Sequence, residues 1–191
     1  MEQKELSNII LMALDNALAN IHTSTIVRIE RVKQKTLDCQ PVINRIVNGE
    51  SKELPLCLDV PPIIMQGGGN YHVHPIKPGN YGILVIMERC YDRWFNGQDL
   101  QPPLELRMHD MSDGFVIVGI NPLAGLIDIP TGNESILNGA QRIKGPLYVE
   151  GSIYATEEVT AKADSAESVT VTGHTHTGNL GAPTSSPTPG T

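Results

Sequence analysis

Hydrophobic residues near the start of the chain recur at the spacing of an α-helix. Most fall three or four positions apart, at Leu6, Ile10, Ala13, Leu14, Ala17 and Ile21. Side chains at this spacing share one face of a helix, so residues 4–20 are predicted to form one amphipathic helix. Two roles are open for its apolar face: packing on the helix's own domain, or docking on a partner.

From Ser24 onward, the spacing of apolar residues changes to that of β-strands. The predicted strands are Thr25–Lys33, Leu37–Val47, Glu53–Val60, Tyr81–Met87 and Phe115–Ile120. Tyr81–Met87 is apolar on both faces, which predicts a central strand. Five short strands with Gly- and Pro-containing turns favour a mostly β fold, a small barrel of the oligonucleotide/oligosaccharide-binding (OB) type. A short sandwich is the alternative.

The third of these segments, Glu53–Val60, alternates most regularly. Its leucines and valine, at Leu54, Leu56, Leu58 and Val60, are separated by Glu53, Pro55, Cys57 and Asp59. Successive side chains of a strand point to opposite faces, so the leucines and the valine are predicted to form the buried face of a half-buried strand.

Asn121 and Pro122 mark a boundary in the sequence. The bulky core formers Trp94, Phe95 and Phe115 lie before it. Beyond it, short apolar alternations are punctuated by glycine, at Leu147 and Val149, Ile153 and Ala155, Val159, Ala161 and Ala163, and Val169 and Val171. Such units are too small to bury a core within one chain, but they suit the narrow interior of three chains wound together. A disordered low-complexity tail is the alternative.

Composition disfavours several classes of function. The formal net charge is −7 over 191 residues without a basic block, so nucleic acid is not an expected partner. Cys39, Cys57 and Cys90 lack CxxC spacing, which argues against a disulfide framework and indicates folding in a reducing cytosol. The first residues do not resemble a signal peptide, and no apolar run approaches the ~20 residues of a membrane helix.

Patterns that would indicate an enzyme fail on spacing. His72 and His74 lack the following acid of a cupin metal site, and residues 67–69, three glycines, are interpreted as a flexible turn. The triad residue types His109, Asp110 and Ser112 stand too close in sequence to align as a triad. The acids of this region are expected to be solvated or ion-paired; they are Glu88, Asp92, Asp110 and Asp113. These patterns therefore give no support for an enzyme or for a small-molecule substrate.

The segment Gly173–Gly178 contains two histidines, His174 and His176, separated by one residue. On an extended strand they would point to the same face and could bind one metal ion together. Two imidazoles are too few, so further ligands would come most simply from other copies of the chain, and three copies would supply six nitrogens. Counting by twos places the pair opposite Val171 unless a bulge at Gly173 resets the register. The alternative is a pair of exposed polar residues on a loose tail.

Two stretches together resemble the central membrane-piercing spike proteins of contractile-tailed bacteriophages and related contractile injection systems. The first is Gly145–Gly151, which leads through short strands to the histidine segment Gly173–Gly178. The second is Glu88–Trp94, followed by Arg107–Gly114, which is similar to the N-terminal barrel region of these baseplate proteins. The resemblance covers nearly the whole chain.

The resemblance implies a homotrimer with four segments: an N-terminal helix (1–22), an OB-fold-like barrel (23–122), a triple-stranded β-helix shaft (123–165) and a metal-binding apex (166–191). The barrel would attach to the baseplate hub protein, and the apex would make transient contact with the host outer membrane. The implied metal is iron, one ion per trimer, held by His174 and His176 of three chains. Six nitrogen ligands disfavour zinc, which prefers four.

The same resemblance implies where the protein acts and how. The chain would be made in the host cytoplasm and reside at the tail baseplate tip of the virion. Relatives that digest the cell wall carry an inserted lysozyme-like domain, for which this chain has no room, so a purely mechanical role is expected. The competing functions are a trimeric tail fibre or receptor-binding adhesin and, third, a metal-dependent hydrolase. The absence of an aromatic-rich head after Tyr154 argues against the adhesin.

Overall fold

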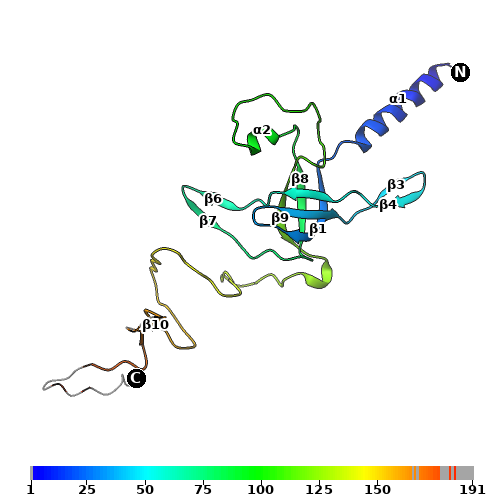
Figure 1. Ribbon diagram of the computed structural model, residues 1–191. Helices are drawn as coiled ribbons and strands as arrows, with labels where there is room; N and C mark the ends of the chain where they lie inside the picture. Colours follow the sequence, from blue (N-terminus) through cyan, green and yellow to red (C-terminus); the bar gives the residue numbers. More distant parts are fainter. Residues whose placement is uncertain (1, 165, 167, 177–180, 182, 184–191) are drawn as a thin grey trace. The chain divides into compact units, whose positions relative to one another are not determined.

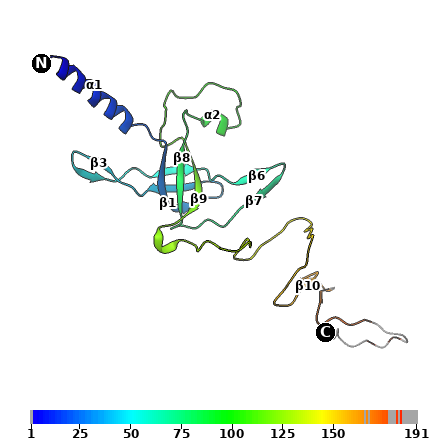
Figure 2. The same cartoon turned by 180° about the vertical axis from the view of Figure 1, so that it is seen from behind.

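The computed structural model describes residues 2–164, 166, 168–176, 181 and 183, which divide into two units, 1–131 and 132–191. The first unit holds an N-terminal helix and a small antiparallel sheet (Figure 1; Figure 2 shows the reverse side). The prediction of a mostly β fold with an N-terminal helix is therefore confirmed. Among the described residues, no helix combines the length and hydrophobicity needed to cross a membrane.

The first unit contains the following elements in chain order: α1 (Glu2–Ala19), β1 (Ser24–Val32), β2 (Leu37–Pro41), β3 (Arg45–Val47), β4 (Glu50–Lys52), β5 (Cys57–Val60), β6 (Met65–Gly67), β7 (Asn70–His72), β8 (Tyr81–Ile86), α2 (Asp92–Phe95), β9 (Gly114–Ile120) and the 3-10 turn η1 (Leu123–Gly125).

Helix α1 forms where the apolar spacing predicts it. Its hydrophobic side chains are exposed, and α1 contacts no other helix or strand that the structure describes. Of the two roles left open by the sequence, packing on the helix's own domain is therefore not what the structure shows.

Five strands form one sheet in the order β5-β2-β1-β8-β9, with every neighbouring pair antiparallel. Strand β8 lies between β1 and β9, which confirms the predicted central position of this apolar segment. The two outer strands also meet, because the chain just after β5 forms a parallel bridge between Pro62 and Val116 of β9. Val116 N donates to Pro61 O at 3.0 Å, and Ile63 N donates to Val116 O at 2.8 Å.

Side chains of this five-stranded sheet form the hydrophobic core. Its buried side chains come from all five strands: Val27, Ile29, Leu37, Cys39, Cys57, Val60, Leu84, Ile86 and Val116. Cys39 and Cys57 stand directly opposite each other on β2 and β5, and both are free thiols, as is the buried Cys90. The expectation that the cysteines form no disulfide framework is confirmed.

Two short hairpins, β3–β4 and β6–β7, extend from the sheet and were not predicted. Each has a two-residue turn with positive φ at both positions: Asn48 (53°) and Gly49 (81°), and Gly68 (57°) and Gly69 (83°). Such turns match the twist of a tight hairpin and favour Asn and Gly. The turn predicted for the three glycines at 67–69 is therefore formed by Gly68 and Gly69, whereas Gly67 is the last residue of β6.

The prediction that Leu37–Val47 forms one strand is wrong. β2 ends at Pro41, and β3 begins only at Arg45, in a separate two-stranded sheet. Pro41, the last residue of β2, has no N–H to donate to a neighbouring strand, although Val42 N still donates to Ile26 O of β1 at 3.0 Å.

The predicted buried face of Glu53–Val60 is also wrong. Cys57 and Val60 are buried, whereas Leu58 and Asp59 are exposed. Cys57 pairs with Cys39 and Val60 with Leu37, so the strand inserts one extra residue as a β-bulge. Asp59 takes a φ of 56° there, and its N–H donates to Asp38 Oδ1 at 3.1 Å.

The second unit contains little regular structure in its described residues. β10 (Thr160–Ala161) and β11 (Val169–Thr170) pair antiparallel, with Thr160 opposite Thr170. The apolar side chains of the predicted shaft are exposed, among them Leu147, Val149, Ile153, Val159 and Val171. One chain therefore buries no core of its own among the described residues of this unit. The predicted apex extends to residue 191, and most of its end, 177–180, 182 and 184–191, lies outside the described residues.

Candidate functional site

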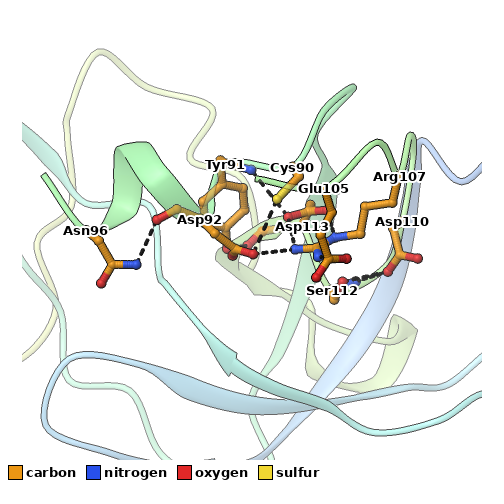
Figure 3. A network of polar contacts seen from close by, with 10 residues as sticks. Cys90, Tyr91, Asp92, Asn96, Glu105, Arg107, Asp110, Ser112 and Asp113 are labelled. Atoms are coloured by element: carbon orange, nitrogen blue, oxygen red, sulfur yellow. Dashed lines mark hydrogen bonds and ion pairs between the residues drawn. The ribbon is translucent and has the colours of Figure 1, made fainter. Parts of the chain in front are cut away.

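Residues 87–113 form a long connection between β8 and β9, and Arg107 holds it together (Figure 3). The Arg107 guanidinium donates to both carboxylate oxygens of Asp113, from Nε at 2.5 Å and from Nη2 at 2.9 Å. The same Nη2 donates to Asp92 Oδ2 at 2.8 Å, and Nη1 donates to Glu105 Oε2 at 2.6 Å. One cation thus links α2, the following loop and the residue just before β9.

The charges in this cluster support one another. Hydrogen bonding to Asp113 raises the pKa of Arg107 above its ordinary value. The Arg107 guanidinium, followed by the Cys90 thiol 3.3 Å away, lowers the pKa of Asp92. Cys90, Asp92 and Asp113 also bring ligand-type atoms within 4.8 Å of one another, but both carboxylates are bound to the guanidinium. The predicted ion pairing is confirmed for Asp92 and Asp113, and the cluster fits a structural clamp better than a metal site.

An aromatic cluster covers the clamp. Tyr91 stacks on Phe115 with ring centroids 4.9 Å apart, and its hydroxyl donates to Gly114 O at 3.1 Å. Burial raises the pKa of Tyr91 to about 12. The loop that follows this aromatic cluster exposes large apolar side chains: Leu100 is 97% exposed and Leu106 is 90% exposed. A rigid base with exposed apolar side chains at its tip is suited to contact another protein.

The histidine, aspartate and serine of this loop do not line up for catalysis. Ser112 Oγ donates to Asp110 Oδ1 at 2.6 Å, and Ser112 N donates to the same oxygen at 2.9 Å. These two hydrogen bonds lower the pKa of Asp110. The Ser112 hydroxyl therefore donates to Asp110 within a local turn. In a catalytic triad the serine hydroxyl must instead donate to the histidine. This geometry agrees with the interpretation that His109, Asp110 and Ser112 are not a triad.

A cleft of about 460 Å³ lies between the β6–β7 hairpin and β9. Its lining is mainly aliphatic, with Ile64, Ile117 and Ile120 among its walls, and it includes both His72 and His74. The two imidazole rings lie 4.5 Å apart, edge to face. The described lining contains no carboxylate, in keeping with the rejection of a cupin-like metal site here.

His174 and His176, the predicted metal ligands, both belong to the described part of the second unit. Their ring centroids lie 5.0 Å apart at an interplanar angle of 83°. They do not share a strand, because β11 ends at Thr170 and residues 171–173 form a turn. The strand assumed in the sequence argument is therefore wrong, and a turn, not a bulge, sets the positions of the two rings.

The turn is closed by the side chain of Thr170. Gly173 N donates to Thr170 Oγ1 at 3.0 Å, and a Cβ at position 173 would lie only 2.5 Å from that oxygen. Glycine is therefore required at this point of close approach. The Glu158 carboxylate accepts hydrogen bonds from the hydroxyl and the N–H of Thr172, which ties the turn to the segment just before β10.

His174 is held in one tautomer by this turn. Its Nδ1 lies 2.9 Å from Val171 O and 3.2 Å from Thr170 O. A carbonyl oxygen can only accept, so Nδ1 carries the hydrogen, and the lone pair of the neutral ring is on Nε2. Histidine ligands of metals commonly donate their second N–H to a backbone carbonyl in this way. The arrangement fits a metal bound at His174 Nε2.

Sequence reasoning missed the Arg107 clamp and the cleft. The clamp joins residues up to 15 positions apart, and no motif connects Asp92 with Arg107. The signal available in the sequence was the density of charged and aromatic residues in an otherwise aromatic-poor chain.

Residues 24–119, half of the chain, match the family described as phage protein Gp138 N-terminal domain. The matched region runs from the first residue of β1 to the last residue but one of β9 and so includes all five strands of the sheet. No curated protein matches the chain.

Proposed function

The chain belongs to the family of phage proteins that share the Gp138 N-terminal domain, and from this premise we propose that it is the central cell-puncturing spike of a contractile-tail baseplate. Membership of a phage protein family indicates a phage structural protein associated with the virion. The finer role proposed is mechanical piercing of the host outer membrane, without catalysis, by the tip of the tail.

The matched domain is the proposed mount, an OB-type barrel over residues 23–122. The strand order β5-β2-β1-β8-β9, with a parallel contact between the end of β5 and β9, supports a five-stranded closed barrel. The loop clamped by Arg107 carries the exposed side chains of Trp94, Leu100 and Leu106. These side chains are the proposed contact with the baseplate hub protein, because exposed apolar patches mark interaction sites and tryptophan is enriched among the residues that dominate interface energies.

The following residues, 123–165, are the proposed shaft of a homotrimer. Their large apolar side chains, such as Leu147 and Ile153, are exposed in the single chain. Two further copies wound around the same axis would bury them, which is the arrangement in which repeats with incomplete cores become stable.

The apex is proposed to bind one iron ion through His174 and His176 of three chains. The Nδ1–H of His174 faces backbone carbonyls, so its Nε2 has the lone pair that coordination requires. Six imidazole nitrogens suit an octahedral ion, whereas Zn²⁺ prefers four ligands. When bound, the ion supplies a cross-link between chain ends that would otherwise fray.

The observation that carries the proposal is the order of these parts along one chain. A folded phage domain is followed by a slender segment without its own core, and then by a histidine pair held by a tight turn. A shaft with a metal-bound end suits a device that transmits force and needs a small cross-section.

Truncation of the virion protein tests the proposed role. Particles whose spike lacks residues 140–191 are expected to assemble and to adsorb to cells normally, but to fail at envelope penetration. The barrel in the first unit has its own core and provides the mount in this variant. Loss of adsorption with normal penetration by particles already bound would replace the spike by a receptor-binding adhesin.

Elemental analysis of the purified protein tests the apex. We expect about one iron per three chains, and its loss in the double variant His174→Ala with His176→Ala. The matched control is the histidine pair of the cleft, since His72→Ala with His74→Ala should keep the full iron content. Metal retained in the apex variant would eliminate these ligands, and stoichiometric zinc would correct the identity of the ion.

A further inference from the structure

The apolar surface of α1 has no partner within the described chain. Its large side chains are 52–65% exposed: Leu6, Ile9, Ile10, Leu11, Met12, Leu14 and Leu18. No other described helix or strand contacts α1. An exposed apolar stretch of this size marks an interaction site.

The apolar positions of α1 form two adjacent stripes. At 100° per residue, Leu6, Ile10, Ala13 and Ala17 follow one line along the helix, and Leu11, Leu14 and Leu18 follow a second, while Ile9 flanks the first line and Met12 lies on the polar side. Asn8, Asp15 and Asn16 lie on the opposite side. A helix docked in a single groove needs one stripe, whereas a helix in a bundle contacts two neighbours and uses both.

Neither the barrel of the same chain nor a membrane is a suitable binding partner for the apolar face of α1. Only residues 20–23 connect α1 to β1, and Asn20 is tied on both sides: Nδ2 donates to Asn16 O at 2.8 Å, and Oδ1 accepts from Arg45 Nη2 at 3.2 Å. This short link limits folding back onto the sheet. Helices that lie on membranes carry several Lys and Arg residues on the polar face, whereas the sequence of α1 contains one lysine, Lys4, against the acids Glu2, Glu5 and Asp15, and its last turn has no basic residue.

We propose that the apolar face of α1 packs against α1 of other copies of this chain, forming a parallel helical bundle at the amino-terminal end of the assembly. Its copy number of three rests on the proposed homotrimeric spike. Burial of the five large side chains on the stripes (Leu6, Ile10, Leu11, Leu14 and Leu18), at on the order of 100 Å² each, removes about 500 Å² per helix from water. Three helices would together bury about 1,500 Å², which falls within the roughly 1,200–2,000 Å² of a specific protein interface.

Cysteine cross-linking of the full-length protein tests the bundle. Leu14→Cys and Leu18→Cys place thiols on the second stripe, and Asp15→Cys is the matched control one residue away on the polar side. A short bismaleimide should convert most of the Leu14→Cys protein to covalent dimers, at least fivefold more than the Asp15→Cys protein. The native thiols are buried and provide a low background. Because α1 contacts no strand, the sheet of each variant is expected to stay folded, which circular dichroism checks.

The outcomes separate this inference from the proposed function. If the wild-type protein has the native mass of a trimer but Leu14→Cys cross-links no better than Asp15→Cys, the bundle is wrong and the spike proposal stands. If the wild-type protein is a monomer at micromolar concentration, both fall. A trimer with cross-linking specific to the two stripe positions supports the bundle.

Discussion

The substitution Arg107→Ala is expected to destabilise the first unit by about 3 kcal/mol. Asp113 is 1% exposed, and Arg107 supplies two hydrogen bonds to it. Without the guanidinium, the Asp113 carboxylate keeps one long hydrogen bond among the described residues, from the backbone N–H of Tyr91 at 3.4 Å. Removal of one partner from a buried ion pair costs about 3–5 kcal/mol. Arg107 is 22% exposed, so we expect the lower end of that range.

Urea unfolding measures this effect. Trp94, the single tryptophan, lies 6.0 Å from Phe115 between ring centroids and reports on the loop by fluorescence, while circular dichroism reports on the sheet. With a slope of about 1.5 kcal/mol per molar urea, a loss of 3 kcal/mol lowers the midpoint by about 2 M.

A control in the same loop is Arg89→Ala. Arg89 pairs with Glu88 at 3.3 Å, but these side chains are 54% and 67% exposed, so the expected change is below about 1 kcal/mol. Adding Asp113→Asn to Arg107→Ala should restore part of the loss, because a neutral amide is less costly to bury than an unpaired carboxylate. If Arg107→Ala lowered the midpoint no more than Arg89→Ala does, the clamp would be refuted.

Three further predictions concern the sheet. The Lys33 ammonium lowers the pKa of buried Asp38, so this pair stabilises the fold above about pH 4 and its contribution is lost as pH falls. Lys33→Met should therefore lower thermal stability at neutral pH and make the further loss in acid smaller, because the pKa of Asp38 is then no longer held below its unfolded value. Gly82→Ala places a Cβ 2.7 Å from a backbone oxygen of β9 and should cost about 1–3 kcal/mol, whereas Gly67→Ala, with open space around it, should be nearly neutral by denaturant unfolding. Burial raises the pKa of Cys39 to about 12, so iodoacetamide at pH 8 should label Cys39 at least about 100-fold more slowly in native than in unfolded protein; equal rates would contradict its burial.

The long elements were predictable because their spacing reflects burial on a single surface. Helix α1 and strands β1, β8 and β9 appear within a few residues of their predicted limits. The hairpin turn at Asn48 and Gly49 is also visible as an Asn-Gly pair, but three-residue strands on either side are too short to show periodicity. The bulge at Asp59 could not be predicted, since it depends on a hydrogen bond to Asp38, 21 residues away.

The candidate site was predictable by residue type and not by geometry. Two histidines separated by one residue are visible in the sequence, but their closeness depends on Thr170, whose hydroxyl ends β11 and begins the turn. The histidine tautomer likewise depends on carbonyls three and four positions upstream. Local side-chain hydrogen bonds of this kind compete with strand pairing, so alternation alone does not reveal where a strand ends.

The distribution of buried apolar residues separates the part of the chain that has its own core from the parts that expose their apolar side chains. The sheet encloses a core drawn from all five of its strands, so the matched phage domain has the means to fold alone. Before it, α1 leaves two apolar stripes exposed, and after it the segment from Leu123 to Val171 exposes nearly every large hydrophobic side chain that is described. Exposed apolar surface on both sides of a self-sufficient domain is unfavourable for a free chain, since its burial is the main favourable contribution to folding. Both segments are therefore the parts of the chain for which we propose burial in an assembly, whereas the sheet supplies its own core.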